Sequence, residues 1–185
     1  MRPVSVGVDF GTSNTVIAVV NEQQRATVLQ VASRNGAATA LPSILCFRPN
    51  ELNPRDRPVS SAGHDAIADF LERTGPARLM QSMKSFLGSK SFVGTSLFAH
   101  TYALEALIGT LLRHLYDATG AQAMLQQNPL VIGRPIEFAG ANPDDALAQS
   151  RLERAFAQAG CVPTRIGLEP EAAAYAFARK TRGRH

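Results

Sequence analysis

Residues 4–20, VSVGVDFGTSNTVIAVV, contain two short runs rich in β-branched residues, separated by the polar break GTSN. Runs of this kind favour β-strands, and a break of a few residues containing glycine joins them as an antiparallel hairpin. A third such run, 26–31, follows after the short connection 21–25. We therefore predict strands at 4–10, 15–20 and 26–31 that lie side by side in one sheet.

The rest of the chain alternates predicted helices and strands. The clearest helix, 101–118, carries its leucines and one isoleucine at helical spacing, which gives one apolar face. We predict further helices at 64–74, 78–87, 144–159 and about 171–180, strands at 42–47, 129–135 and 164–170, and a loop at 49–58. Three antiparallel strands followed by strand–helix–strand–helix imply an α/β fold. Its mixed sheet would have parallel strands after the antiparallel ones, with helices on its faces.

The tip of the first hairpin collects an aspartate, a glycine and three hydroxyl or amide side chains: Asp9, Gly11, Thr12, Ser13 and Asn14. Backbone N–H groups at such a tip can bind an anion, and Gly11 lets a phosphate approach without a Cβ in the way. Asp9 would repel a bare phosphate, so its presence points to a divalent cation such as Mg²⁺. An ordinary polar hairpin uses the same residue types, and these residues alone leave both interpretations open. The site is not a Walker A loop, because no Gly-Lys-Ser/Thr follows.

Composition narrows the class of protein. The chain is 45% hydrophobic and 18% charged, as in globular proteins, and no apolar run approaches the ~20 residues of a membrane span. Asp9 interrupts the only apolar stretch near the N-terminus, which argues against a secretory signal. We expect a cytoplasmic protein with no membrane partner.

The net charge of +4 belongs to one end of the chain. Four basic residues lie within the last seven: Arg179, Lys180, Arg182 and Arg184. Without them, 15 basic residues balance 15 acidic ones, and no aromatic residues interleave this tail as in a nucleic-acid platform. We expect no nucleic-acid partner. Cys46 and Cys161 are expected to be buried reduced thiols, and the histidines lack metal-ligand spacing.

Four segments together resemble one family. VGVDFGTSNTVIAV is similar to the first phosphate motif of the actin, sugar-kinase and heat-shock-chaperone ATPase superfamily. LMQSMKSFLGSK (79–90), LVIGRPIEF (130–138) and IGLEPEAAAYAFA (166–178) resemble, in the same order, segments of the seventy-kilodalton heat-shock chaperones (heat shock protein 70). The Gly-Arg-Pro strand end suggests a divergent bacterial branch. The resemblance covers nearly the whole chain and implies the ribonuclease-H-like fold of an actin-like ATPase lobe, in which 32–100 is an inserted subdomain between 1–31 and 101–180.

The resemblance also implies roles for particular residues. Asp9 would hold Mg²⁺ through water, and Gly11, Thr12, Ser13 and Asn14 would cradle the phosphates of ATP or ADP. Lys84 would stabilise charge on the γ-phosphate, and Glu169 would polarise the attacking water or help position Mg²⁺. Read without the resemblance, Lys84 is a solvated lysine on an amphipathic helix. Glu169 with Pro170 is a common way to begin a helix.

The sequence departs from the family pattern at three places. Arg134 stands before Pro135, where a small or apolar residue is usual, and Gln149 falls where the family has a relay arginine. The second phosphate loop and the Gly-rich adenosine segment of the second lobe do not occur in the sequence. We therefore expect the first lobe alone, with little or no ATP hydrolysis, contacts to unfolded polypeptide or co-chaperones only through other regions, and self-association through the exposed cleft face.

Three alternatives belong to other classes. The chain would be a non-catalytic interaction module if it kept the fold and lost the chemistry. A ribonuclease-H-like nuclease also begins with a strand that carries an aspartate, but it needs several clustered carboxylates. A sugar kinase shares the first motif but not its combination with the segments around Lys84 and Glu169.

Overall fold

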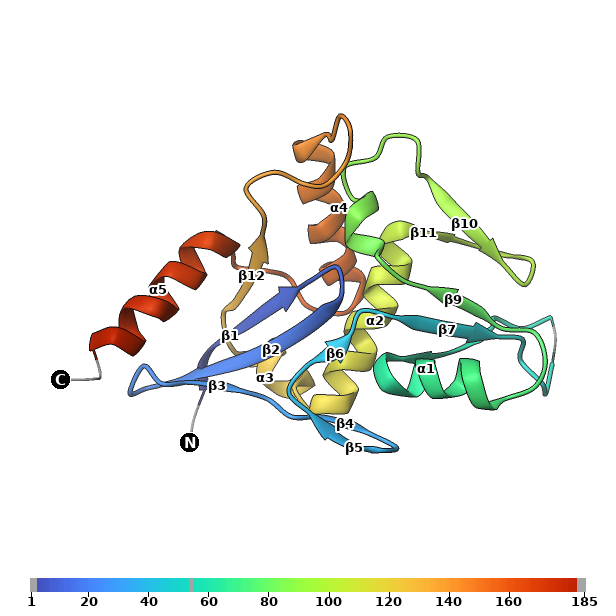
Figure 1. Ribbon diagram of the computed structural model, residues 1–185, viewed down its shortest axis with the longest axis horizontal. Helices are drawn as coiled ribbons and strands as arrows, with labels where there is room; N and C mark the ends of the chain where they lie inside the picture. Colours follow the sequence, from blue (N-terminus) through green and yellow to red (C-terminus); the bar gives the residue numbers. More distant parts are fainter. Residues whose placement is uncertain (1–2, 54, 183–185) are drawn as a thin grey trace.

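The structure, a computed structural model, describes residues 3–53 and 55–182. Its main sheet has the strand order β13-β12-β1-β2-β3, and β6 adds to β2 (Figure 1). The strands are β1 (Pro3–Phe10), β2 (Asn14–Asn21), β3 (Ala26–Val28), β6 (Leu41–Pro42), β12 (Leu130–Arg134) and β13 (Arg165–Leu168). β1, β2 and β3 pair antiparallel, whereas β12 pairs parallel with both β1 and β13. The predicted α/β fold with a mixed sheet is confirmed.

The central strand β1 sets the two faces of the sheet. Val6, Val8 and Phe10 are buried on one face, while Asp9 lies on the other because side chains alternate along a strand. Val6 pairs with Val19 of β2 and with Leu130 of β12. Since β1, β12 and β13 are parallel, their carboxyl ends lie at the same edge of the sheet, and the residues that follow them meet there.

Two helices cover the buried face. They are α2 (Leu104–Thr119) and α4 (Asp145–Gln158), joined by the short α3 (Gln122–Gln127) and β12. α2 and α4 pack closely at Gly109, where a Cβ would lie 3.1 Å from the carbonyl oxygen of Ala155. Asp144 caps α4 by accepting a hydrogen bond from Leu147 N at 2.9 Å, as expected for this residue type. The resulting core joins these helices to the sheet.

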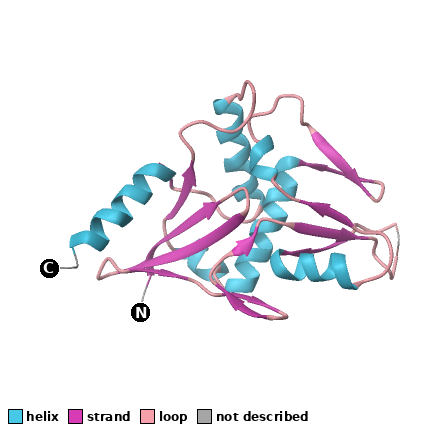
Figure 2. Cartoon of the chain, in the orientation of Figure 1, coloured by secondary structure: helices cyan, strands magenta, loops and turns pink. Residues whose placement is uncertain are grey.

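Small sheets and one helix fill the region between β3 and α2 (Figure 2). They are the hairpin β4 (Val31–Ser33) with β5 (Gly36–Ala38), the sheet β8 (Val59–Ala62)-β7 (Leu45–Arg48)-β9 (Arg78–Met80), and the hairpin β10 (Gly94–Leu97) with β11 (His100–Ala103). α1 (Gly63–Glu72) and the 3₁₀ helix η1 (Met83–Phe86) complete the region. The insertion predicted at 32–100 falls within it, and its boundaries stay a prediction.

The predicted helix at 78–87 is wrong. Residues 78–80 form β9, because Met80 pairs with Leu45 of β7, and Ser82 then takes a left-handed conformation with φ 57° that stops any helix. Only the four residues of η1 turn helically. The apolar spacing in this segment reflects contacts with two different neighbours rather than one helix face.

Smaller corrections concern element ends. The strand predicted at 26–31 divides into β3 and β4, and the strand predicted at 42–47 divides into β6 and β7. The helix predicted at 101–118 begins at Leu104, because 100–103 pair with β10. The helices predicted at 64–74 and 144–159 and the strands predicted at 4–10, 15–20, 129–135 and 164–170 are confirmed within a few residues.

α5 (Glu169–Arg182) extends along the side of the molecule opposite α1 (Figure 1). Arg179 donates from Nη1 to the carbonyl oxygen of Gln24 at 2.7 Å, which ties the helix to the β2–β3 turn. Of the basic tail, Arg184 lies outside the described residues. No helix within 3–53 or 55–182 is long and apolar enough to cross a membrane. Cys46 and Cys161 are buried and free, as predicted.

The burial of one face of α2 predicts that two leucine-to-alanine substitutions will differ in their effect on stability. Leu111 is 0% exposed, whereas Leu71 of α1 is 74% exposed. We expect Leu111→Ala to lower the free energy of unfolding by about 2–5 kcal/mol, because a cavity remains in the core. The control Leu71→Ala should change it by less than about 0.5 kcal/mol. Urea denaturation measures both, and equal losses would contradict the packing described here.

Candidate functional site

Three charged side chains from distant parts of the chain meet at the carboxyl end of β1. Lys84 Nζ donates to Glu169 Oε1 at 2.5 Å, and Lys84 is only 8% exposed. Gly133 of β12 lies between Glu169 and Asp9: a Cβ there would stand 3.1 Å from Glu169 Cγ and 3.8 Å from Asp9 Oδ1. A glycine at this place therefore leaves room for two carboxylates beside each other.

Asp9, Lys84 and Glu169 line a pocket with a volume of about 300 Å³. Its lining comes from the hairpin tip, η1, the segment after β12 and the start of α5: Asp9, Gly11, Thr12, Lys84, Ser85, Pro135, Glu137, Phe138, Ala139 and Glu169. The structure thus brings five of the seven sequence-predicted site residues to one place. Ser13 and Asn14, the other two, are exposed and do not line this pocket.

The charges of the site act on Asp9. Partial burial raises the pKa of its carboxyl above the usual value, the Glu169 carboxylate raises it further, and the Lys84 ammonium lowers it. Asp9 and Glu169 share the single ammonium of Lys84, so the cluster formed by these three side chains favours an additional positive charge.

The turn at the hairpin tip requires a glycine at position 11. Gly11 N donates to the carbonyl oxygen of Asn14 at 3.0 Å, and a Cβ on Gly11 would lie 2.3 Å from that oxygen. The Gly11 amide is therefore used by the turn itself. Within the described residues, the amides of Thr12 and Ser13 have no hydrogen-bond partner, so these two are the ones available to an anion.

Ser43, which the sequence analysis did not identify, holds the tip in place. Its hydroxyl donates to Gly11 O at 2.8 Å and contacts Thr15 Oγ1 at 2.9 Å, while its amide donates to Ser13 O at 2.8 Å. Ser43 and Thr15 are 1% and 0% exposed. In the sequence, Thr15 and Ser43 are polar residues beside apolar strand residues, which could have marked them as unusual. Neither local sequence indicates that the two side chains, 28 residues apart, contact each other.

Lys84 is positioned by its own short turn. Met83 and Leu87 on either side are 2% and 0% exposed, so the backbone of η1 is fixed against the core. The turn begins at Ser82 with φ 57° and continues through a hydrogen bond from Leu87 N to Lys84 O at 3.2 Å. A lysine on a solvated helix, the alternative considered from sequence, is excluded by this burial.

The two departures from the resembled family contact each other. Arg134 donates from Nη1 to Gln149 Oε1 at 3.0 Å and from Nη2 to Asp145 Oδ2 at 3.1 Å. Its guanidinium also donates to the carbonyl oxygens of Pro135 and Ile136. The segment that lines the pocket after β12 is therefore held to α4 by Arg134.

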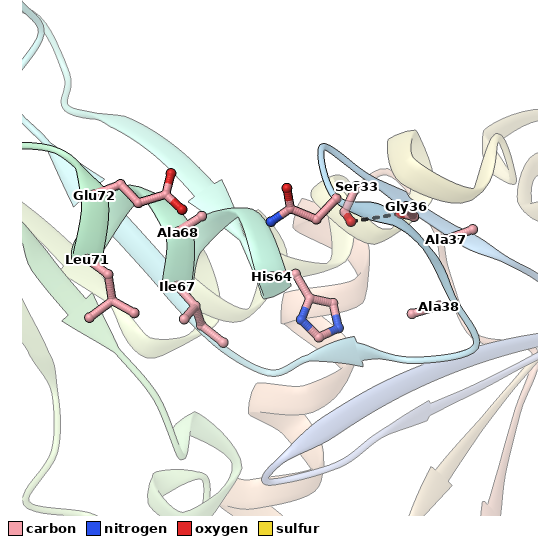
Figure 3. A pocket seen from close by; sticks show the side chains of 10 residues that line it. Ser33, Gly36, Ala37, Ala38, His64, Ile67, Ala68, Leu71 and Glu72 are labelled. Atoms are coloured by element: carbon pink, nitrogen blue, oxygen red, sulfur yellow. Dashed lines mark hydrogen bonds between the residues drawn. The ribbon is translucent and has the colours of Figure 1, made fainter.

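A second hollow, with a volume of about 340 Å³, lies between the β4–β5 hairpin and α1 (Figure 3). Figure 3 shows His64 at its middle, with Ile67 and Leu71 along α1 and the Ser33–Gly36 turn opposite. None of the predicted site residues lines it. Among the residues described, no group of three or more His, Cys, Asp or Glu is arranged to hold a metal ion.

No protein-family model matches the chain. The assignment of the site therefore depends on its geometry and on the sequence resemblance.

The buried hydroxyl of Ser43 yields a stability prediction. Ser43→Ala should lower the free energy of unfolding by about 1–3 kcal/mol, because Gly11 O and Thr15 Oγ1 lose a buried hydrogen-bond partner. The control is Ser33→Ala, which removes an exposed hydroxyl that donates to Gly36 O in another hairpin. It should cost less than about 0.5 kcal/mol. Equal effects in chemical denaturation would contradict the role of Ser43.

The charge cluster yields a second prediction, on the pKa of Asp9. Lys84→Met should raise this pKa because the ammonium that lowers it is removed. Glu169→Gln should lower it because the carboxylate that raises it becomes neutral. NMR titration of the Asp9 carboxyl carbon measures both. Shifts in the same direction in both variants would show that the three side chains are not coupled as the structure places them.

Proposed function

We propose that this chain binds the phosphates of ATP or ADP together with Mg²⁺, as the first lobe of an actin-like ATPase of the heat-shock-70 type. The observation that carries the proposal is the ion pair between Lys84 and Glu169, formed by residues 85 positions apart beside Asp9 and the hairpin tip. These are the side chains to which the sequence resemblance gives catalytic and metal roles. A buried lysine among carboxylates, with free amides nearby, suits a phosphate and its cation.

The fold supports the same proposal. Three antiparallel strands followed by parallel β12 and β13, with helices between, match the order expected of a ribonuclease-H-like lobe. The carboxyl ends of parallel strands are where open α/β sheets bind ligands. Asp9 precedes the end of β1 and Glu169 follows β13 directly, which places both at that edge.

The residues present fit Mg²⁺. Carboxylate oxygens are the ligands that this ion prefers, and it commonly uses one or two of them with water and phosphate oxygens. Asp9 and Glu169 supply these oxygens. Burial and the neighbouring Glu169 carboxylate raise the pKa of Asp9 while Lys84 lowers it, so a further cation beside Asp9 would favour its ionised form. Asp9 would hold the ion, with Glu169 close enough to contribute through water. The ion would neutralise charge on the phosphates.

The side chains of the chain would then divide the work. Thr12 and Ser13 amides would receive phosphate oxygens, and Lys84 would stabilise charge on the terminal phosphate. Lys84 would have to share its ammonium with Glu169, which limits how far the lysine can move. Glu169 would orient a water molecule. With the contacts of one lobe only, we expect slow or undetectable hydrolysis.

The wider role is proposed on the resemblance alone. A cytoplasmic chaperone would use other regions to contact unfolded polypeptide or co-chaperones. Pro135, which in the family links nucleotide state to movement, lines the pocket here. The face of the sheet around the pocket is the surface through which we propose self-association.

Two alternatives differ in what they require of the pocket. A non-catalytic interaction module would keep the fold without Mg²⁺-dependent nucleotide binding. A nuclease needs several carboxylates clustered around its metal ions. Glu137 lines the pocket with Asp9 and Glu169, but within the described residues no three such side chains are arranged to hold a metal ion. The buried Lys84 beside them favours phosphate binding over two-metal chemistry.

Binding of a fluorescent ATP analogue tests the proposal. We expect binding that requires Mg²⁺ and that weakens at least about tenfold, or about 1.4 kcal/mol, in Asp9→Ala because the metal ligand is lost. The control Asp56→Ala removes an exposed aspartate of the loop before β8 and should leave the affinity unchanged. Circular dichroism checks that both variants fold. Absence of Mg²⁺-dependent binding in the wild type would refute the proposed function.

A further inference from the structure

Arg151 of α4 has four backbone hydrogen bonds to one short segment. Its Nη1 donates to Phe86 O at 3.3 Å, Leu87 O at 3.1 Å and Ser89 O at 2.8 Å, and its Nη2 donates to Phe92 O at 2.7 Å. The side chain is 9% exposed. A buried guanidinium is costly unless its donors are satisfied, and here a ring of carbonyl oxygens satisfies them.

The counter-charge of Arg151 is shared with another arginine. Arg151 Nε lies 3.8 Å from Glu105 Oε1, whereas Arg154 Nη2 lies 2.7 Å from the same oxygen. Burial alone would raise the pKa of Glu105, but the hydrogen bond from Arg154 and the charges of both arginines bring it below its usual value. The carboxylate thus stays ionised. The carbonyl oxygens, rather than this carboxylate, take up the Nη groups of Arg151.

The segment bound by Arg151 continues directly from the turn that carries Lys84. Gly88 within it packs closely on the residues just before α4: a Cβ would lie 2.9 Å from Pro143 Cβ, and the Gly88 carbonyl oxygen accepts from the N-cap Asp144 N at 3.0 Å. Lys90 pairs with Asp144 at 3.0 Å. The start of α4 therefore holds the middle of the segment, and Arg151, two turns further along, holds both of its ends.

We propose that Arg151 is a positioning residue for Lys84: by binding the carbonyl oxygens of residues 86–92, it fixes η1 so that the Lys84 ammonium stands at Glu169 beside Asp9. Arg151 does not line the pocket and acts only through the backbone. The importance of this placement for phosphate chemistry rests on the proposed function. The placement itself belongs to the chain and can be measured without nucleotide.

Arg151→Lys tests the proposal because it keeps the charge but replaces a planar fork of donors by one flexible ammonium. The amides of Leu87, Ser89 and Phe92 are hydrogen-bonded within the segment, so their hydrogen exchange reports its opening. We expect exchange at these amides to rise at least about tenfold, equivalent to about 1.4 kcal/mol, with β1 amides unchanged. The control Arg154→Lys, on the same helix and the same Glu105, should leave the segment unchanged.

The reactivity of the Lys84 amine separates positioning from stability. In the wild type only 9% of the Lys84 side chain is exposed to solvent. In Arg151→Lys a loosened η1 should expose it further, so the rate of Lys84 acylation, measured by mass spectrometry, should increase at least about threefold. Lys90, whose side chain is 76% exposed, is the internal reference. Unchanged reactivity of Lys84 would overturn the proposal, whether or not exchange in the segment increases.

A measurement on the wild-type chain covers the case in which Arg151→Lys does not fold. The Nη protons of Arg151 should exchange slowly with solvent and give distinct NMR signals, because carbonyl oxygens hold both nitrogens. Rapid rotation that averages these signals would overturn the proposal. The two proposals can fail separately. If the wild type showed no Mg²⁺-dependent nucleotide binding but Lys84 became more reactive in Arg151→Lys, the proposed function would be refuted and the positioning role of Arg151 would stand.

Discussion

The ammonium of Lys84 is buried, and a buried charge needs a partner of opposite sign. Glu169 provides it from the other end of the chain, at the point where β13 becomes α5. The pair therefore ties the small-sheet region to the edge of the main sheet. Removing either member leaves an unpaired charge beside Asp9, which is why the arrangement of the site depends on this contact more than on the hairpin tip.

Sequence patterns predicted the long, regular elements whose apolar residues all enter the main core. The apolar faces of α2 and α4 and the strands of the central sheet follow simple periodicities because each keeps one regular conformation along its length and turns those residues into the same core. The helix prediction for 78–87 was wrong because the first residues of the segment pair with β7 and the later ones pack into the core. Ser82, with φ 57°, separates the two parts. Local spacing cannot report such a change of partner. The hairpins β4–β5 and β10–β11, whose strands have three or four residues, were too short to predict.

The candidate site was predictable only in part, and by resemblance rather than by pattern. Asp9 and Glu169 had ordinary local explanations, and the structure shows that they meet because parallel strands end together. Gly133 and Ser43 were not identified. A glycine in a strand and a serine before an apolar run say nothing locally about the carboxylates or the hairpin that they support. Tertiary contacts across 28 or more residues give them their roles.

The two departures around Pro135 are better understood together than separately. In the family that the chain resembles, a relay arginine falls at about the position of Gln149, and a small or apolar residue is usual before the proline. Here the arginine precedes the proline as Arg134, and its guanidinium donates to Gln149 on α4. In this chain the pair connects the Pro135 segment to α4, and Asp145 adds a salt bridge to the same guanidinium at 3.1 Å.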